Sequence, residues 1–79
     1  MYLRGFFMSR KMVQIKDGES YITLNVLLKL TNIISTGGEA KYFLANNEVL
    51  VNGILENRRG RKLYPGDVVK VSGQEFEIK

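Results

Sequence analysis

Residues 49–71 read VLVNGILENRRGRKLYPGDVVKV, and the turns in this stretch indicate how the chain folds. Residues 49–51 and 54–55 are short apolar runs on either side of Asn52-Gly53, a dipeptide that favours the tight turn of a β-hairpin. The stretch therefore predicts a pair of short antiparallel strands, which need further strands or a helix to bury their apolar face.

Further turns extend this sheet in both directions. Pro65-Gly66-Asp67 precedes an apolar run at 68–71, and Ser72-Gly73 follows it. Residues 75–78 then alternate between Glu and apolar side chains, which is typical of a strand with one face in the core. Residues 12–16 alternate in the same way before an Asp-Gly turn. We predict a small, mostly antiparallel sheet.

Two short helices are predicted between the first strand and the hairpin. Thr23 can cap the first, because apolar side chains follow at helical spacing: Leu24, Leu27 and Leu28. Thr36 and Glu39 have the spacing of a capping box, in which the Thr36 hydroxyl accepts from the Glu39 N–H and the Glu39 carboxylate accepts from the Thr36 N–H. Asn47 is expected to end the second helix in a left-handed conformation.

The composition limits the class of protein. A chain of 79 residues makes one small domain, and a hydrophobic fraction of 44% is enough for it to fold. The sequence contains neither Cys nor His, which excludes disulfides, thiol nucleophiles, zinc sites and most general acid–base catalysis. We expect a non-enzymatic protein with no metal, no cofactor and no small-molecule substrate. The composition leaves the oligomeric state open, and a monomer is favoured.

The net charge of +4 is unevenly distributed. Residues 1–16 and 58–79 are basic, whereas residues 17–57 are acidic. About a dozen residues separate the strands that end at 55 and begin at 68, a long connection for so small a domain. This basic loop contains a cluster of cations: Arg58, Arg59, Arg61 and Lys62. A cluster of this kind suits a polyanion, and because the loop is polar we expect it to contribute little to stability.

From residue 24 to 71 the chain resembles the S4-type RNA-binding domain (αL motif). The family pattern runs Leu-Asp-x-x-Leu, Ser-Arg-x-x-Ala, Val-Asn-Gly and Gly-Asp-x-Ile/Val. The matching positions are Leu24-Asn25 with Leu28, Thr36 with Ala40, Val51-Asn52-Gly53, and Gly66-Asp67 with Val69. More narrowly, residues 57–64 with 35–38 are similar to the small stand-alone YaaA/YbcJ-type branch of the family.

The resemblance implies an α+β fold with two helices packed on a small, mostly antiparallel sheet. It also implies a bacterial, cytoplasmic protein that binds structured ribosomal RNA and takes part in ribosome assembly. Two cationic positions of the pattern are absent, because Thr23 and Gly37 stand where many relatives have Arg. We expect the basic loop to compensate for them.

The predicted RNA-binding site combines this loop with the N-terminus of the second helix. Lys and Arg side chains bind phosphates, helix N-termini favour anions, and an exposed Tyr can stack on a base. The predicted site residues are Thr36, Gly37, Gly38, Lys41, Tyr42, Arg58, Arg59, Arg61 and Lys62.

Each of these features also has a purely structural interpretation. A basic cluster is often solvated surface, and Gly37-Gly38 can serve close packing between the helices. Tyr42 and Tyr64 are more often satellite packing than stacking platforms. The residues of the Val-Asn-Gly and Pro-Gly-Asp turns, namely Gly53, Gly66 and Asp67, are interpreted as structural.

Two other classes of protein remain as alternatives. The order of elements also resembles the β-grasp sulfur carriers, whose chemistry needs a C-terminal Gly-Gly. This chain ends Glu77-Ile78-Lys79, which disfavours that class. A protein–protein adaptor that uses a sheet edge is neither supported nor excluded.

The N-terminal apolar run is broken by Arg4-Gly5 and is too short for a signal peptide or a membrane span. We therefore expect a cytoplasmic protein that does not bind a membrane. Residues 1–11 are predicted to form a basic arm, either a flexible segment that touches phosphates or a non-native extension, and residues 12–79 the S4-like domain.

Overall fold

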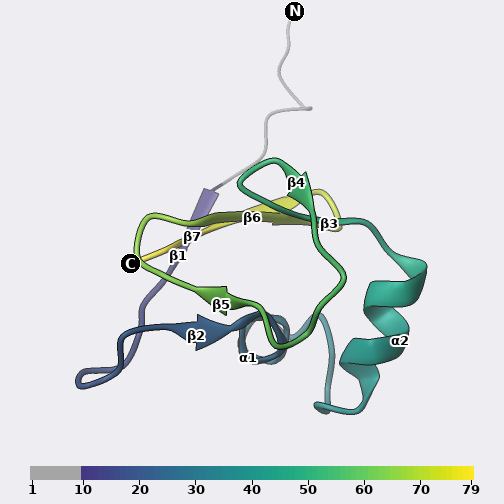
Figure 1. Cartoon of the computed structure of the whole chain (residues 1–79), viewed down its shortest axis with the longest axis horizontal. Helices are drawn as coiled ribbons and strands as arrows, with labels where there is room; N and C mark the ends of the chain where they lie inside the picture. The colour runs from purple at the N-terminus through teal and green to yellow at the C-terminus, as the bar shows by residue number, and fades with distance from the viewer. Residues whose placement is uncertain (1–9) are drawn as a thin grey trace, which may run out of the picture.

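The computed structural model describes residues 10–79, which form an α+β fold (Figure 1). The elements are β1 (Arg10–Val13), β2 (Ile22–Thr23), α1 (Leu24–Leu30), α2 (Glu39–Asn46), β3 (Val49–Val51), β4 (Ile54–Leu55), β5 (Lys62–Leu63), β6 (Val68–Val71) and β7 (Gln74–Ile78). The strands predicted at 49–51, 54–55 and 68–71 are confirmed.

Among residues 10–79, five strands form one sheet in the order β1-β7-β6-β3-β4, in which only β1 and β7 pair in parallel. A second, two-stranded ladder joins β2 to β5 within the described residues. In Figure 1 the large sheet crosses the top of the view, with the β2–β5 ladder and α1 below it and α2 at one side. The predicted architecture of two helices on a mostly antiparallel sheet is therefore confirmed.

The first strand begins earlier than the sequence predicts. Arg10 and Lys11, which were assigned to the N-terminal arm, lie in β1 opposite Glu75 and Phe76 of β7. The Arg10 guanidinium also forms ion pairs of 3.1 Å with Glu75 and with Glu77. No local pattern marks this start, because the partner strand is at the other end of the chain. The rest of the predicted arm, residues 1–9, lies outside the described residues.

Apolar side chains from both helices and both sheets form one core. The three leucines predicted for the inner face of α1, at positions 24, 27 and 28, are completely buried. Phe76 and Ile78 of β7 are buried on the same side, as their alternation with Glu predicts. Burial of one Leu or Phe side chain stabilises the folded state by about 1.5–3 kcal/mol. The core is therefore a stable base for the loops that connect its strands and helices.

The caps of the two helices differ from each other. The Thr23 hydroxyl accepts a hydrogen bond of 3.3 Å from the Val26 N–H, which confirms the predicted cap of α1. In α2 only half of the capping box forms: the Glu39 carboxylate accepts from the Thr36 N–H at 3.0 Å and also from the Ser35 N–H. The Thr36 hydroxyl does not cap the helix, because the chain forms a turn at 37–38 and Gly38 occupies the N-cap position.

The end of α2 also differs from the prediction. Asn47 has an extended backbone (φ −135°, ψ 146°) rather than a left-handed one. Its side-chain amide donates to the Phe43 carbonyl at 3.0 Å. A side chain therefore satisfies a terminal carbonyl of α2, and the chain can enter β3 without a left-handed residue.

The two turn motifs of the family pattern contact each other. The Asn52 side chain donates to the Asp67 carboxylate at 3.0 Å and accepts from the Val68 N–H at 2.9 Å. Gly53 and Gly66 have φ values of 83° and 99°, a region that disfavours residues with a Cβ. The structural interpretation of these turns is confirmed, and they fix both ends of the basic loop.

Candidate nucleic-acid interface

The basic loop, residues 56–67 between β4 and β6, contains the short strand β5 and is anchored to the start of α1. The Leu24 N–H donates to the Arg61 carbonyl and the Asn25 N–H donates to the Arg59 carbonyl, both at 2.9 Å. The first amides of a helix have no partner within the helix, so here the loop supplies their acceptors. The backbone of the loop therefore has a defined position on the domain.

A buried acid, Glu56, lies under this loop, and only 7% of its surface is exposed. Its carboxylate accepts hydrogen bonds from the Arg58 backbone and guanidinium and, at 2.8 Å, from Nη1 of Arg61. The side-chain hydrogen bond from Arg58 is the main cause that lowers the pKa of Glu56 to about 2, against the opposing effect of burial. Glu56 is thus ionised and neutralises part of the loop.

This role of Glu56 is not predicted from the sequence. The sequence places Glu56 among the acids of the central segment, although its position two residues before Arg58 and five before Arg61 is a signal of local pairing. These ion pairs are a reason to expect that Arg58 and Arg61 do contribute to stability, unlike the rest of the loop. Both guanidinium groups compensate a buried charge.

The remaining cations of the predicted site have no acidic partner within residues 10–79. Arg59 and Lys62 are exposed on the loop, and Lys41 is exposed on α2. Arg58 pairs with Glu56 but keeps 71% of its side chain exposed. The loop therefore presents Arg59, Lys62 and the outer part of Arg58 to solvent, with Arg61 lying deeper.

The two glycines before α2 have different surroundings. A Cβ on Gly37 would lie 3.4 Å from Nδ2 of Asn25 in α1, whereas a Cβ on Gly38 would meet only the Thr36 hydroxyl, at 3.9 Å. The absence of a Cβ at Gly37 thus allows the turn before α2 to lie close to α1. Asn25 and Gly37 occupy the Asp and Arg positions of the family pattern, so these two positions are neighbours in space.

The N-terminus of α2 already has an acidic side chain in front of it. Hydrogen bonds from the Ser35 and Thr36 amides lower the pKa of Glu39, so this carboxylate is ionised. The amides of Gly37 and Gly38 have no hydrogen-bond partner among the described residues. An incoming phosphate would meet these two amides and also the charge of Glu39.

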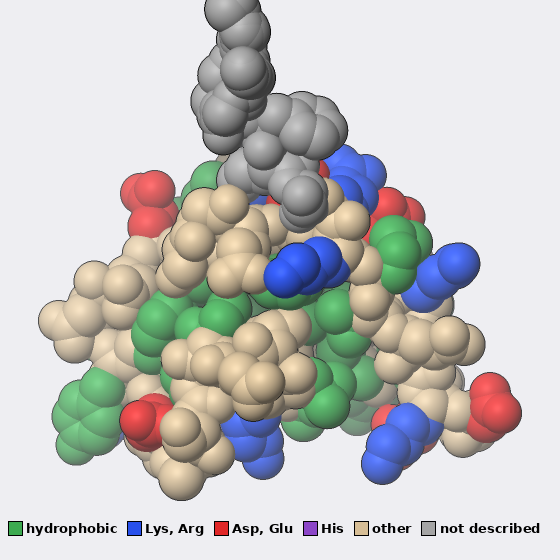
Figure 2. All heavy atoms as spheres, turned by 180° about the vertical axis from the view of Figure 1, so that it is seen from behind, with side chains coloured by type: hydrophobic (Ala, Val, Ile, Leu, Met, Phe, Trp, Pro, Cys, Tyr) green, Lys and Arg blue, Asp and Glu red, His purple; other side chains and the backbone are tan. Residues whose placement is uncertain are grey.

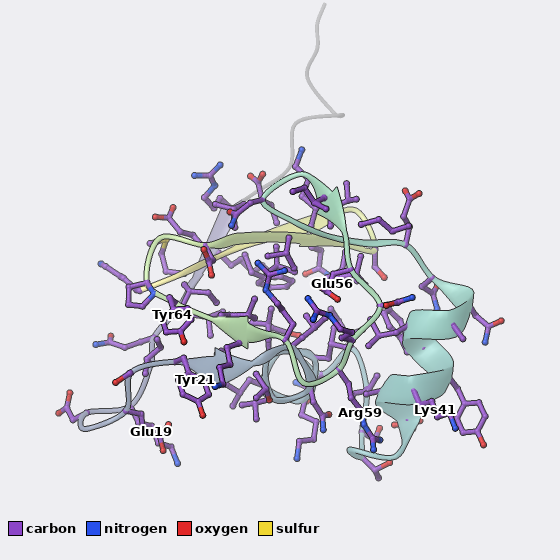
Figure 3. The ribbon with its side chains drawn as sticks, in the orientation of Figure 1. Glu19, Tyr21, Lys41, Glu56, Arg59 and Tyr64 are labelled. Atoms are coloured by element: carbon purple, nitrogen blue, oxygen red, sulfur yellow. The ribbon has the colours of Figure 1, made fainter. Side chains whose placement is uncertain are left out.

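Two of the predicted site residues, Arg59 and Lys41, lie on the face of the domain that is seen in Figure 3. Figure 3 shows Arg59 and Lys41 toward α2, and Tyr21 and Tyr64 at the other end of the basic loop. Tyr42 is 70% exposed on α2. On the opposite face, Figure 2 shows Lys and Arg side chains dispersed among uncharged and acidic ones rather than gathered in a patch. The face seen in Figure 3 is therefore the candidate interface.

In the described part of the chain, no cluster of three acidic side chains could hold a metal ion. None of its helices has the length and apolarity needed to cross a bilayer.

The chain matches one protein family and is similar to proteins from two bacteria. The S4 domain model matches residues 13–79. The probable ribosome maturation protein RlbA of Bacillus subtilis (strain 168) is 60% identical over 52 residues, which cover 66% of this chain and 73% of that protein. The putative RNA-binding protein YbcJ of Escherichia coli (strain K12) is 31% identical over 58 residues, which cover 73% of this chain and 83% of that protein.

Proposed function

The chain belongs to the S4 domain family, and on this premise we propose that it is a non-enzymatic RNA-binding protein of the bacterial cytoplasm. Its RNA is structured ribosomal RNA, and its role is in ribosome assembly. The name of the Bacillus relative, a probable ribosome maturation protein, supports this role. The observation that carries the RNA-binding proposal is the anchored basic loop, which exposes cations that have no acidic partner among residues 10–79.

The proposed interface is divided between the loop and α2. Arg59 and Lys62 bind phosphates directly, and the exposed part of Arg58 adds a third contact. Arg61 acts mainly by holding Glu56. On the other side, Lys41 and Tyr42 provide a cation and an aromatic ring on the exposed surface of α2.

The Gly37 and Gly38 amides, which have no hydrogen-bond partner among the described residues, complete this interface. Thr36, Gly37 and Gly38 form the turn before the helix, where backbone N–H groups favour an anion. The residues proposed for RNA binding are therefore those predicted from the sequence: Thr36, Gly37, Gly38, Lys41, Tyr42, Arg58, Arg59, Arg61 and Lys62. We propose residues 12–79 as the RNA-binding domain, with Arg10 and Lys11 extending its sheet.

Crosslinking in the native cell tests the identity of the RNA. Tagged protein is crosslinked with ultraviolet light, purified under denaturing conditions, and the attached RNA is sequenced. We expect ribosomal RNA reads to be enriched over an Arg59→Ala/Lys62→Ala variant expressed at the same level. Enrichment of another RNA class would contradict the ribosomal assignment. Recovery of no RNA would favour the adaptor, for which Ile54 and Leu55, exposed on edge strand β4, offer a surface.

A substitution at Gly38 tests the contribution of α2. Gly38→Glu should weaken RNA binding about threefold to tenfold, because a second carboxylate joins Glu39 in front of the free amides. Gly38→Gln is the matched control, since it has nearly the same size without the charge, and position 38 has room for either side chain. Equal affinity of the folded Glu and Gln variants for a structured RNA would remove the N-terminus of α2 from the interface.

A further inference from the structure

Two exposed tyrosines flank the β2–β5 ladder. In this ladder Ile22 pairs with Leu63, and both side chains point into the core. Successive residues of a strand face opposite ways, so Tyr21 before β2 and Tyr64 after β5 both turn outward. Their ring centroids are 5.7 Å apart with an interplanar angle of 49°. The two side chains keep 37% and 46% of their surface exposed.

Cationic groups border this aromatic pair. Lys62 lies two residues before Tyr64, on the same outward face, and its ammonium is 5.1 Å from the centroid of the Tyr21 ring. A shallow pocket adjoins Tyr64 and is lined by Arg58, Gly60, Arg61, Lys62, Tyr64 and Asp67. Figure 3 shows Tyr21 and Tyr64 together beside β2 and β5, away from Lys41 on α2.

The Asp67 carboxylate in this pocket is already engaged. One of its oxygens accepts from the Asn52 amide at 3.0 Å, and the other accepts from the Tyr64 N–H at 2.8 Å. The second bond fixes the backbone of Tyr64. The side chains of Arg58 and Lys62 are therefore the charged groups on this pocket that remain available to a ligand.

We propose that Tyr21 and Tyr64 form a platform on which an unpaired base of the RNA stacks, while Lys62 and Arg58 hold its phosphate. The inference rests on the proposed function and deepens it, because it assigns a single-stranded segment as the part of the RNA bound here. Aromatic rings beside cations are the arrangement that binds single strands without strict sequence preference. A plain duplex, whose bases are already stacked, cannot use the platform.

Paired oligonucleotides of equal charge test this platform. Fluorescence polarisation is measured with a labelled RNA strand of ten uridines and with an abasic ribose-phosphate strand of the same length, at one salt concentration. Three proteins are compared: wild type, Tyr21→Leu/Tyr64→Leu, and Tyr21→Phe/Tyr64→Phe, which keeps the rings. We expect wild type and the Phe variant to bind the uridine strand about tenfold more tightly than the abasic strand.

The Leu variant should lose this preference and bind both strands with the affinity that wild type has for the abasic strand. A preference that survives in the folded Leu variant would overturn the platform. Equal binding of both strands by wild type would overturn base stacking but leave the proposed RNA binding intact. Absence of binding to either strand and to structured RNA would contradict the proposed function itself.

A second measurement does not depend on the variants being folded. Wild-type protein is irradiated with a strand that contains 5-iodouridine, and the crosslinked peptide is identified by mass spectrometry. Attachment to Tyr21 or Tyr64 would support the platform. Attachment only to residues of α2, such as Tyr42, would overturn it.

Discussion

Removing both Arg58 and Arg61 by alanine substitution is expected to lower the free energy of unfolding by about 2–3 kcal/mol. Both guanidinium groups bind the carboxylate of Glu56, which is 7% exposed and would be left buried without a partner. Losing one side of a fully buried ion pair costs about 3–5 kcal/mol, and the exposure of Arg58 reduces the cost here. Chemical denaturation monitored by circular dichroism measures the change.

Two matched variants separate this effect from a general loss of positive charge. Arg59→Ala/Lys62→Ala removes the same charge from the same loop but leaves Glu56 paired, so its stability should stay within about 0.5 kcal/mol of wild type. Adding Glu56→Gln to the Arg58/Arg61 variant removes the buried charge and should recover part of the loss. Equal destabilisation by both double substitutions would refute the structural role of Glu56.

The same carboxylate gives this prediction a pH dependence of known sign. In the folded protein the pKa of Glu56 is about 2, below its ordinary value of 4.5, so the unfolded chain takes up the proton first. The contribution to stability is present above about pH 4.5 and is lost as the pH falls toward 2. Glu39, whose pKa is also lowered, acts in the same direction. Glu56→Gln should therefore be less stable at neutral pH and lose less stability on acidification than wild type.

Local patterns in the sequence predict those parts of the fold that local interactions determine. Asn52-Gly53 and Ser72-Gly73 form the expected turns, with positive φ at all four residues. Thr23 caps α1 as its spacing predicts, since donor and acceptor are three residues apart. Two strands of two residues, β2 and β5, were missed because they are too short to carry a recognisable period, whereas β4, equally short, was predicted from the Asn52-Gly53 turn before it.

The parts of the fold and of the candidate site that were not predicted depend on contacts between residues distant in the sequence. Arg10 lies in a strand only because β7 pairs with it. The Tyr21–Tyr64 pair exists only because β2 and β5 meet, and its exposure follows from the burial of Ile22 and Leu63 on the other face. At the candidate site, the sequence indicates which residues are basic. The structure distinguishes the cations that hold Glu56 from those that have no acidic partner among residues 10–79.

The number of cations that are available to phosphates determines how RNA binding should depend on salt. With about four phosphate contacts to a single strand, log affinity against log salt should have a slope of about −3, a loss of nearly two decades between about 50 and 200 mM. Arg59→Gln/Lys62→Gln should change the slope to about −1.5, because each lost contact removes about 0.7. The variant should remain as stable as wild type, since neither side chain pairs with Glu56. A salt titration by fluorescence polarisation measures both slopes.

The control removes the same charge elsewhere in the domain. Lys16 and Lys29 are exposed and have no acidic partner among the described residues, so Lys16→Gln/Lys29→Gln lowers the net charge equally without touching the basic loop. If RNA binds the loop, this variant should keep the wild-type slope. If only net charge mattered, both double variants would shift the slope alike. Equal slopes for wild type and the Arg59/Lys62 variant would exclude the loop from the interface, because counterion release at a phosphate requires a cation close to it.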